Sequence, residues 1–281
     1  MKPPRGLVGV LHLPALPGDP RPAGDFRAAE AHALRDAERL AEAGFDALIV
    51  ENFGSAPFPK GTAGHRLPPH QVAFMALVVR AAAERTGLPI GVNCLRNDAL
   101  AALGIAAATG AAFVRVNVHT GAYVTDQGLI EGEADVSLRY RAQLGAEVAL
   151  LADVLVKHAS PLAPLGAEQA AEEALDRGGA EGIVVTGRGT GQPVDPELLA
   201  EARRGAGERP VWIGSGLVPE TASTLAPLAD AAIVGTFTKE GGDVRAPVDP
   251  SRARHIVEAA RGRFRPVPGG PDDPPREGAS S

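Results

Sequence analysis

Two short apolar runs near the end of the chain stop at glycine, in a pattern that could bind a phosphate. One covers 211–216 (VWIGSG) and the other covers 231–236 (AAIVGT). The loops after strands 7 and 8 of a (βα)8 barrel commonly hold phosphate through backbone N–H groups, which glycine lets approach an anion closely. The alternative is that buried parallel strands merely end in glycine at tight turns. The predicted phosphate ligands are Gly214, Ser215, Gly216, Gly235 and Thr236.

Two neighbouring residues extend this predicted phosphate site. Gly187 follows the apolar run at 183–185, and it would place a small donor beside the other glycines. Lys239 comes shortly after the last run, so its ammonium group could neutralise the charge of a bound anion.

Six consecutive apolar runs also end in side chains that ionise or form hydrogen bonds. Because parallel strands in a barrel direct their carboxyl ends to one mouth, these side chains should meet there. Each alone has a structural alternative, since a histidine can bind a loop carbonyl and an asparagine can cap a helix, as we expect of Asn97. The predicted substrate-binding residues are His12, Asn52, Asn93, Asn117, His119 and Thr186.

The segment 152–158 (ADVLVKH) supplies most of the predicted catalytic groups. If it stays extended, Asp153 and Lys157 share a face but lie about 13 Å apart, too far for a direct ion pair. We interpret Lys157 as a fixed charge or general acid, with a Schiff-base nucleophile and an exposed loop residue as alternatives. Glu51 is the candidate general base, and His158 completes the predicted catalytic set.

A divalent metal is an alternative use of three of these residues. Glu51, Asp153 and His158 offer oxygen and nitrogen ligands, but no close spacing of the H-x-x-x-H kind supports a metal site. We therefore predict no cofactor and leave the metal as an open alternative.

These residues need elements to position them, and the chain alternates apolar runs with amphipathic segments eight times. Eight units are the number that a closed (βα)8 barrel requires, and continuous apolar runs are typical of parallel strands buried on both faces. The rival is an open doubly wound sheet, but no G-x-G-x-x-G follows the first run. The expected strands are 7–11, 47–50, 90–92, 113–116, 148–156, 183–185, 211–213 and 231–234, and the expected helices are 25–43, 69–86, 97–109, 133–144, 166–177, 196–204, 221–225 and 250–263.

The remaining segments are two long loops and a polar end. Residues 54–68 and 119–132 are too long for simple connections, so we expect them to close over the mouth, with surface decoration as the alternative. We assign 1–264 to one barrel domain. Residues 265–281 contain almost no apolar side chain, and we predict a disordered tail there.

Composition excludes several classes of protein. A length of 281 residues with 44% hydrophobic content suits a single α/β barrel. A net charge of −6 disfavours a nucleic-acid binder, and the single cysteine, Cys94, excludes an intramolecular disulfide. No apolar run approaches the roughly 20 residues that cross a membrane. We expect a cytoplasmic protein that binds a small phosphorylated ligand; whether it forms a homo-oligomer through its outer helices stays open.

Several motifs along nearly the whole chain resemble the BtpA/SgcQ family. The resemblance implies a (βα)8 barrel of the ribulose-phosphate-binding type, and the family takes its name from a photosystem I assembly factor. The segment 235–242 departs from the Gly-Thr-x-Phe-Lys pattern of that family, which shifts Lys239 by one place. The motifs are 9–18 (GVLHLPALPG), 50–54 (VENFG), 56–58 (APF), 91–93 (GVN), 115–117 (RVN), 152–158 (ADVLVKH) and 214–216 (GSG).

Two functional hypotheses follow from the residues and the resemblance. In the first, the chain is an enzyme that acts on a sugar phosphate or nucleotide-like compound by acid/base chemistry, and aldol cleavage, isomerisation and hydrolysis all fit. In the second, it is a non-catalytic photosystem I biogenesis factor that binds partners through its outer helices or a loop. The polar mouth favours the enzyme, whereas the family name favours the factor.

Overall fold

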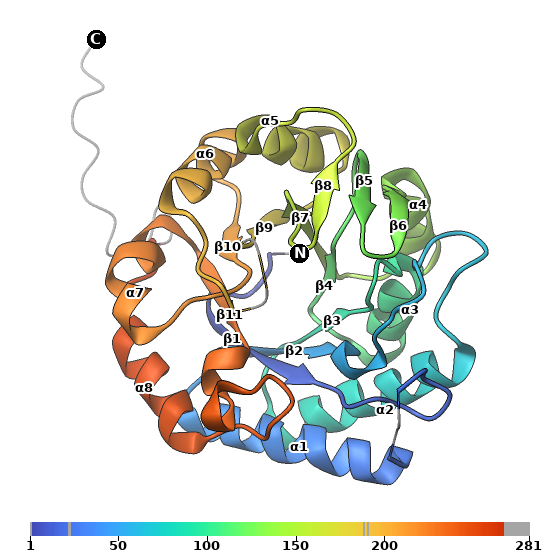
Figure 1. Ribbon diagram of the computed structural model, residues 1–281, viewed down its shortest axis with the longest axis vertical. Helices are drawn as coiled ribbons and strands as arrows, with labels where there is room; N and C mark the ends of the chain where they lie inside the picture. Colours follow the sequence, from blue (N-terminus) through green and yellow to red (C-terminus); the bar gives the residue numbers. More distant parts are fainter. Residues whose placement is uncertain (1, 22–23, 188, 190, 267–281) are drawn as a thin grey trace.

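Eight parallel strands close into a barrel, and helices form a ring outside it (Figure 1). The computed structural model describes residues 2–21, 24–187, 189 and 191–266. The barrel strands are β1 Gly6–His12, β2 Ala47–Glu51, β3 Ile90–Asn93, β4 Phe113–Val116, β7 Ala149–Val154, β9 Gly182–Val185, β10 Val211–Ile213 and β11 Ala231–Val234. Their order around the barrel is β1-β11-β10-β9-β7-β4-β3-β2, so the predicted (βα)8 barrel is confirmed.

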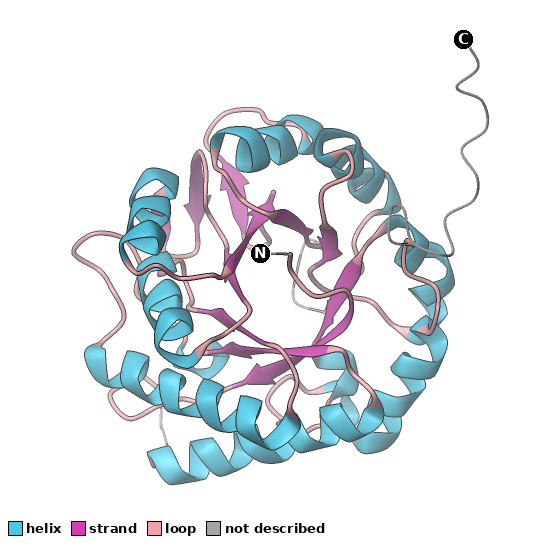
Figure 2. Cartoon of the chain, turned by 180° about the vertical axis from the view of Figure 1, so that it is seen from behind, coloured by secondary structure: helices cyan, strands magenta, loops and turns pink. Residues whose placement is uncertain are grey.

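Helices cover the outer face of the barrel on all sides (Figure 2). They are α1 Phe26–Ala43, α2 Pro69–Thr86, α3 Ala99–Thr109, α4 Ala134–Gln143, α5 Ala167–Glu172, α6 Pro196–Ala206, α7 Pro219–Leu225 and α8 Pro250–Ala260. A π-helical turn, η2 Glu173–Arg177, continues α5. Short 3-10 turns are η1 Phe53–Ser55, η3 Ala226–Leu228, η4 Thr236–Thr238 and η5 Glu240–Gly242.

Local sequence signals account for where these helices begin and end. The side chain of Asp25 accepts a hydrogen bond from the Ala28 N–H at the start of α1, and Gly44 takes the left-handed conformation after its end. The start of α3 differs from our expectation. Asp98 caps this helix, whereas both polar atoms of the Asn97 amide bind the backbone of Val118, at 2.8 and 2.7 Å.

Every second residue of each strand points into the barrel, and the lower interior is entirely apolar. Phe113 and Trp212 meet there edge to face, with ring centroids 5.1 Å apart. Gly91 makes room for the Phe113 ring, because a Cβ atom at this position would overlap the ring carbons. The same alternation carries polar side chains into the interior one layer higher, at the carboxyl ends of the strands.

The predicted long loop at 119–132 contains regular structure. It folds into a hairpin of β5 Ala122–Thr125 and β6 Gly128–Glu131, and β8 Ala159–Pro161 pairs with β5 to make a small antiparallel sheet. Tyr123 and Ile130 pack with Val118 and Val156 in a small separate core beneath this sheet. Residues 119–132 therefore contain a regular antiparallel hairpin beside β8 instead of an irregular loop (Figure 1).

The predicted strand at 148–156 is too long. β7 ends at Val154, because Leu155 has a positive φ of 49° and His158 one of 58°. Such values break an extended strand, so the 13 Å separation expected between Asp153 and Lys157 does not apply.

Two further sequence predictions concern the end of the chain and membrane-spanning segments. Most of the expected tail at 265–281 lies outside the described residues, and that prediction stays untested. Among the helices of the described ranges, none is both long enough and apolar enough to span a membrane.

Replacing Gly91 by alanine should destabilise the barrel by about 1–3 kcal/mol, because the added methyl group overpacks the interior against Phe113. Urea unfolding monitored by circular dichroism measures this change. Gly104→Ala is the matched control, since a Cβ at this position in α3 meets only the Tyr140 hydroxyl, at 3.4 Å, and alanine favours helix. Equal stability of the Gly91→Ala variant and the native protein would contradict the packing argument.

Candidate functional site

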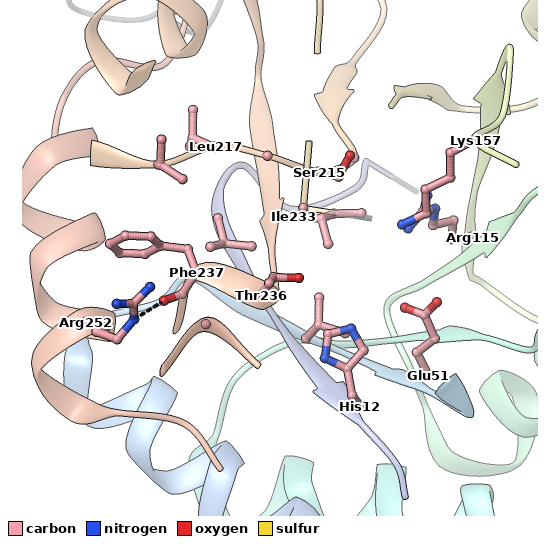
Figure 3. A pocket seen from close by; sticks show the side chains of 18 residues that line it. His12, Glu51, Arg115, Lys157, Ser215, Leu217, Ile233, Thr236, Phe237 and Arg252 are labelled. Carbon is pink, nitrogen blue, oxygen red and sulfur yellow. Dashed lines mark hydrogen bonds between the residues drawn. The ribbon is translucent and has the colours of Figure 1, made fainter. Parts of the chain in front are cut away.

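Two adjoining cavities occupy the mouth of the barrel. The first, which we call the glycine pocket, has a volume of about 200 Å³ and lies against the loops after β10 and β11 (Figure 3). The second, the outer pocket, has a volume of about 250 Å³ and lies against the loops after β1, β2, β3, β7 and β11. Glu51, Arg115 and Lys157 line both cavities, so the two pockets meet at these three side chains.

The glycine pocket contains five of the predicted phosphate ligands: Gly214, Ser215, Gly216, Gly235 and Thr236. Within the described part of the chain, the backbone N–H groups of Ser215 and Gly216 donate to no acceptor. Gly216 has a φ of 74°, and a Cβ atom there would overlap the Gln192 carbonyl group. The loop thus presents free N–H donors in a conformation that only glycine adopts without strain, which suits an anion.

Lys239 lies elsewhere than we predicted. Its ammonium group is completely buried behind the pocket and binds the carboxylate of Asp36 in α1 at 2.5 Å. Arg252 of α8 lines the glycine pocket instead. The Arg252 guanidinium stacks 4.6 Å from the centroid of the Phe237 ring and donates to the Phe237 carbonyl (Figure 3). Arg252 is therefore the cation beside the glycine loops of this pocket, which Arg115 and Lys157 also line.

Glu51 and Lys157 lie on the same side of the glycine pocket, with Arg115 between them (Figure 3). Glu51 is only 6% exposed, yet among the described residues its carboxylate accepts no hydrogen bond and forms no ion pair. The Lys157 ammonium likewise has no hydrogen-bond or ion-pair partner in the described ranges. Burial and the nearby Arg115 lower the pKa of Lys157, while Glu51 and Asp153 oppose this shift.

A buried ion pair sits beneath these two groups. Arg115 donates two hydrogen bonds to Asp153, at 2.8 and 2.9 Å, and Asn117 donates a third at 2.8 Å. The Arg115 and Asp153 side chains are 2% and 0% exposed. Asp153, which we predicted to be catalytic, is thus engaged as the partner of Arg115. Its visible role in this structure is to hold Arg115 and Asn117 in place.

His12 and Asn93 are buried at the same level as Glu51. The strand register places His12 beside Glu51 and Glu51 beside Asn93, so the three side chains point into the barrel together. His12 Nδ1 and both polar atoms of the Asn93 amide have no hydrogen-bond partner in the described residues. Burial lowers the pKa of His12 well below its ordinary value, and the charges of Lys239 and Lys157 lower it further. His12 is therefore neutral at pH 7.

Three of the residues predicted to bind substrate form hydrogen bonds within the protein instead. Asn52 is fully buried and holds the backbone of Leu95 through both ends of its amide, at 3.1 and 2.7 Å. His119 binds the Gly178 carbonyl through Nε2 at 2.7 Å and lines neither pocket. The Thr186 hydroxyl accepts a hydrogen bond from the Lys157 N–H at 3.1 Å. These residues position loops of the mouth.

Two further predicted residues lie at the edge of the site. The Gly187 N–H donates to the Ser215 hydroxyl at 3.3 Å, so Gly187 supports the loop after β10 without lining the pocket. His158 lines the outer pocket, where burial and the neighbouring Lys157 lower its pKa.

The alternative metal site is not assembled. In the described ranges no three His, Cys, Asp or Glu side chains gather closely enough to hold a metal ion. Of the three proposed ligands, Asp153 is occupied by Arg115.

Reasoning from the sequence overlooked Arg115, Arg252 and the arginines of the outer pocket. A signal for Arg115 was present, because it stands between two valines in a buried strand, on the same face as Phe113 and Asn117. Arg252 gave no such signal, because nothing in the sequence distinguishes it from the other charged residues of the outer helices.

The fold and the mouth define a (βα)8 barrel with a glycine-bordered pocket at the carboxyl ends of its strands. Comparison with known proteins then gives the family. The chain belongs to the BtpA family, whose model matches residues 4–262.

Relatives with similar identity occur in different organisms. The Photosystem I biogenesis protein BtpA of Synechocystis is 44% identical over 253 residues, which cover 90% of this chain and 87% of that protein. An uncharacterized protein of Pyrococcus furiosus is also 44% identical, over 251 residues covering 89% and 93% of the two chains. A mitochondrial uncharacterized protein of Caenorhabditis elegans is 32% identical over 260 residues, covering 90% of this chain and 91% of its own.

Solved structures with the same fold are more distant in sequence. N-(5'-phosphoribosyl)anthranilate isomerase from Pyrococcus furiosus aligns with a TM-score of 0.54 at 13% identity, covering 91% of this chain and 98% of its own. Orotidine 5'-phosphate decarboxylase from Pyrococcus horikoshii aligns with a TM-score of 0.53 at 16% identity, covering 91% and 99%. These similarities independently support the barrel.

Replacing His12 by glutamine should flatten the pH dependence of stability below about pH 6.5. Folding lowers the pKa of His12, so at mildly acidic pH His12 is protonated in the unfolded chain and neutral in the folded chain. The free energy of unfolding therefore falls as the pH falls. The stability that neutral His12 contributes is fully present above the pKa that this residue has in the unfolded chain. It is lost at up to about 1.4 kcal/mol per pH unit as the pH drops toward the pKa of His12 in the folded chain.

Urea unfolding measures the slope of the free energy of unfolding against pH, at pH values about one unit apart between 7.5 and 4.5. His65→Gln, a change of the same kind at an exposed position, is the control. An unchanged slope in His12→Gln would show that burial does not hold this histidine neutral.

Proposed function

We propose that this chain is an enzyme that binds a phosphorylated small molecule and transforms it by acid/base chemistry. The observation that carries the proposal concerns one cavity. It contains backbone N–H groups of a glycine loop that donate to no acceptor in the described residues, and the charged groups of Glu51 and Lys157, which have no ion-pair partner there. A buried charge without a partner costs stability, so a protein that keeps the buried Glu51 and the partly buried Lys157 facing one space gains something by doing so. Binding and turnover of a substrate are such a gain.

In this proposal the phosphate lies in the glycine pocket. The N–H groups of Ser215 and Gly216 donate to its oxygens, and the hydroxyl of Thr236 and the guanidinium of Arg252 complete the set of donors. Fixing the phosphate holds the rest of the molecule over the polar layer, which lowers the entropic cost of reaching the transition state.

Glu51 then acts as the base and Lys157 as the acid. The carboxylate of Glu51 removes a proton from the substrate, and the ammonium of Lys157 donates to the oxygen on which negative charge develops. The lowered pKa of Lys157 makes it a better proton donor near neutral pH. Arg115, held by Asp153, adds a fixed positive charge beside that oxygen. Isomerisation beside a carbonyl and aldol cleavage are both compatible with this arrangement.

A non-catalytic role in photosystem I biogenesis is the second candidate. The observation in its favour is the relative of that name in Synechocystis, at 44% identity over nearly the whole chain. Binding a partner through outer helices would not require the free charges in the mouth. For this reason we place the enzyme first.

Replacing Thr236 by aspartate should abolish stabilisation by phosphorylated ligands, because a carboxylate in the glycine pocket repels the phosphate. For native protein, a ligand at a hundred times its Kd adds about 2.7 kcal/mol of stability, which thermal shift detects readily. A panel of sugar phosphates and nucleotides supplies the ligands.

Thr236→Asn is the matched control, because asparagine has the shape of aspartate without its charge. It should keep most of the shift. If no phosphorylated compound shifts the native melting temperature, or if the aspartate and asparagine variants respond alike, phosphate does not bind at these glycines.

Replacing Glu51 by glutamine should lower turnover of any such ligand by about 10²–10⁴-fold while leaving its binding intact. Phosphorus NMR or mass spectrometry of the incubated ligand measures turnover, and thermal shift measures binding. Glu84→Gln, which removes an exposed carboxylate from α2, is the control. Binding without turnover by the native protein would favour the non-catalytic candidate, and full turnover by Glu51→Gln would remove Glu51 from the mechanism.

A further inference from the structure

The outer pocket is lined by more cationic than anionic side chains. A single phosphate bound in the glycine pocket leaves this excess of positive charge without an anionic ligand. Its walls contain two carboxylates, from Glu51 and Asp126. Five cationic side chains line the same walls: Arg21, Arg96, Arg115, Lys157 and Arg245. Asp153 neutralises Arg115, so the other four cations stand against the two carboxylates. In a chain whose net charge is −6, such a concentration of arginines in one cavity points to an anionic occupant.

Arg96 shows that this part of the outer pocket is held in a defined position. Its side chain is only 6% exposed, its Nη2 donates to the Lys157 carbonyl at 2.8 Å, and its Nε lies 3.4 Å from Asp126 in the turn of the β5–β6 hairpin. Asn52 holds the preceding residue, Leu95, by its backbone. A buried guanidinium tied to two segments of the mouth is a stable donor for a carboxylate or phosphate.

Exposed arginines and an apolar wall complete the outer pocket. Arg21 follows β1 and Arg245 follows β11, and both side chains reach the cavity from the solvent side. Phe53 and Phe58, in the segment after β2, line it as well. The cavity thus offers apolar contact for carbon atoms and cationic contact for a charged end group.

We propose that the substrate carries two anionic groups, one at each end of the molecule. The inference rests on the proposed function, which places a phosphate in the glycine pocket; the second anion, a carboxylate or another phosphate, binds Arg96, Arg245 and Arg21 in the outer pocket. Glu51, Arg115 and Lys157 line both cavities, so a ligand spanning them carries its reacting carbon atoms between the two anions. The outer pocket then determines which phosphorylated compounds the protein selects.

Calorimetric titration with straight-chain alkyl phosphates of several lengths tests this inference. The probes end in a methyl group, a carboxylate or a second phosphate. We expect the methyl-ended probes to bind, and at least one probe with a second anionic group to bind at least about tenfold more tightly, a gain of about 1.4 kcal/mol. Preference for the carboxylate or the phosphate end then identifies the second anion.

Arg245→Gln and Arg21→Gln should each remove much of this gain while leaving the affinity for methyl-ended probes unchanged. Both residues are exposed, so their replacement leaves the fold intact. Arg139→Gln is the control, because it removes one positive charge from α4, where the side chain is 76% exposed and away from both pockets.

The possible failures are distinguishable. If methyl-ended probes bind and no charged end group improves affinity, the outer subsite is wrong and the phosphate site stands. If the gain survives in both arginine variants, or falls equally in Arg139→Gln, it comes from the general field of the protein and the outer subsite is again wrong. If no probe binds at all, the phosphate site itself fails, and this inference fails with it.

Discussion

The ion pair between Arg115 and Asp153 is the constraint on which the mouth of the barrel depends. Both groups are buried on neighbouring strands, β4 and β7, and removing one partner from such a pair typically costs about 3–5 kcal/mol. Because the two charges neutralise each other, Asp153 is not available to Lys157, whose ammonium stays unpaired within the described residues. Asn117 is oriented by the same carboxylate.

The barrel divides into an apolar lower interior and a polar upper layer, and the loops above it are anchored from outside. The buried Lys239–Asp36 pair ties the segment after β11 to α1, and Asp36 also accepts the Val248 N–H at 2.8 Å. On the opposite side, Arg96 connects the loop after β3 to the β5–β6 hairpin. These anchors hold the loops that line the glycine and outer pockets, and the polar groups lie between them.

Much of the architecture could be predicted from the sequence, because hydrophobic periodicity reports burial directly. The eight strands and the helices between them lie close to their predicted positions, and the glycine runs after β10 and β11 line a pocket together. Glu51 and Lys157 also reach this cavity. The errors lie where local pattern and conformation diverge. Leu155 continues an apolar run yet turns the backbone, and residues 119–132 form a hairpin that their length alone suggested was a loop.

The sequence by itself determined the barrel and the general location of its polar mouth, since strand periodicity and chain order need no knowledge of distant contacts. Only the tertiary structure decided which polar side chains bind a partner within the protein and which, among the described residues, do not. Asp153 and Lys239 read from the sequence as site residues, but each binds a partner from another element. Arg252 and Arg96 enter the pockets from an outer helix and a loop. A side chain's availability depends on its neighbours in space, and those neighbours come from distant parts of the chain.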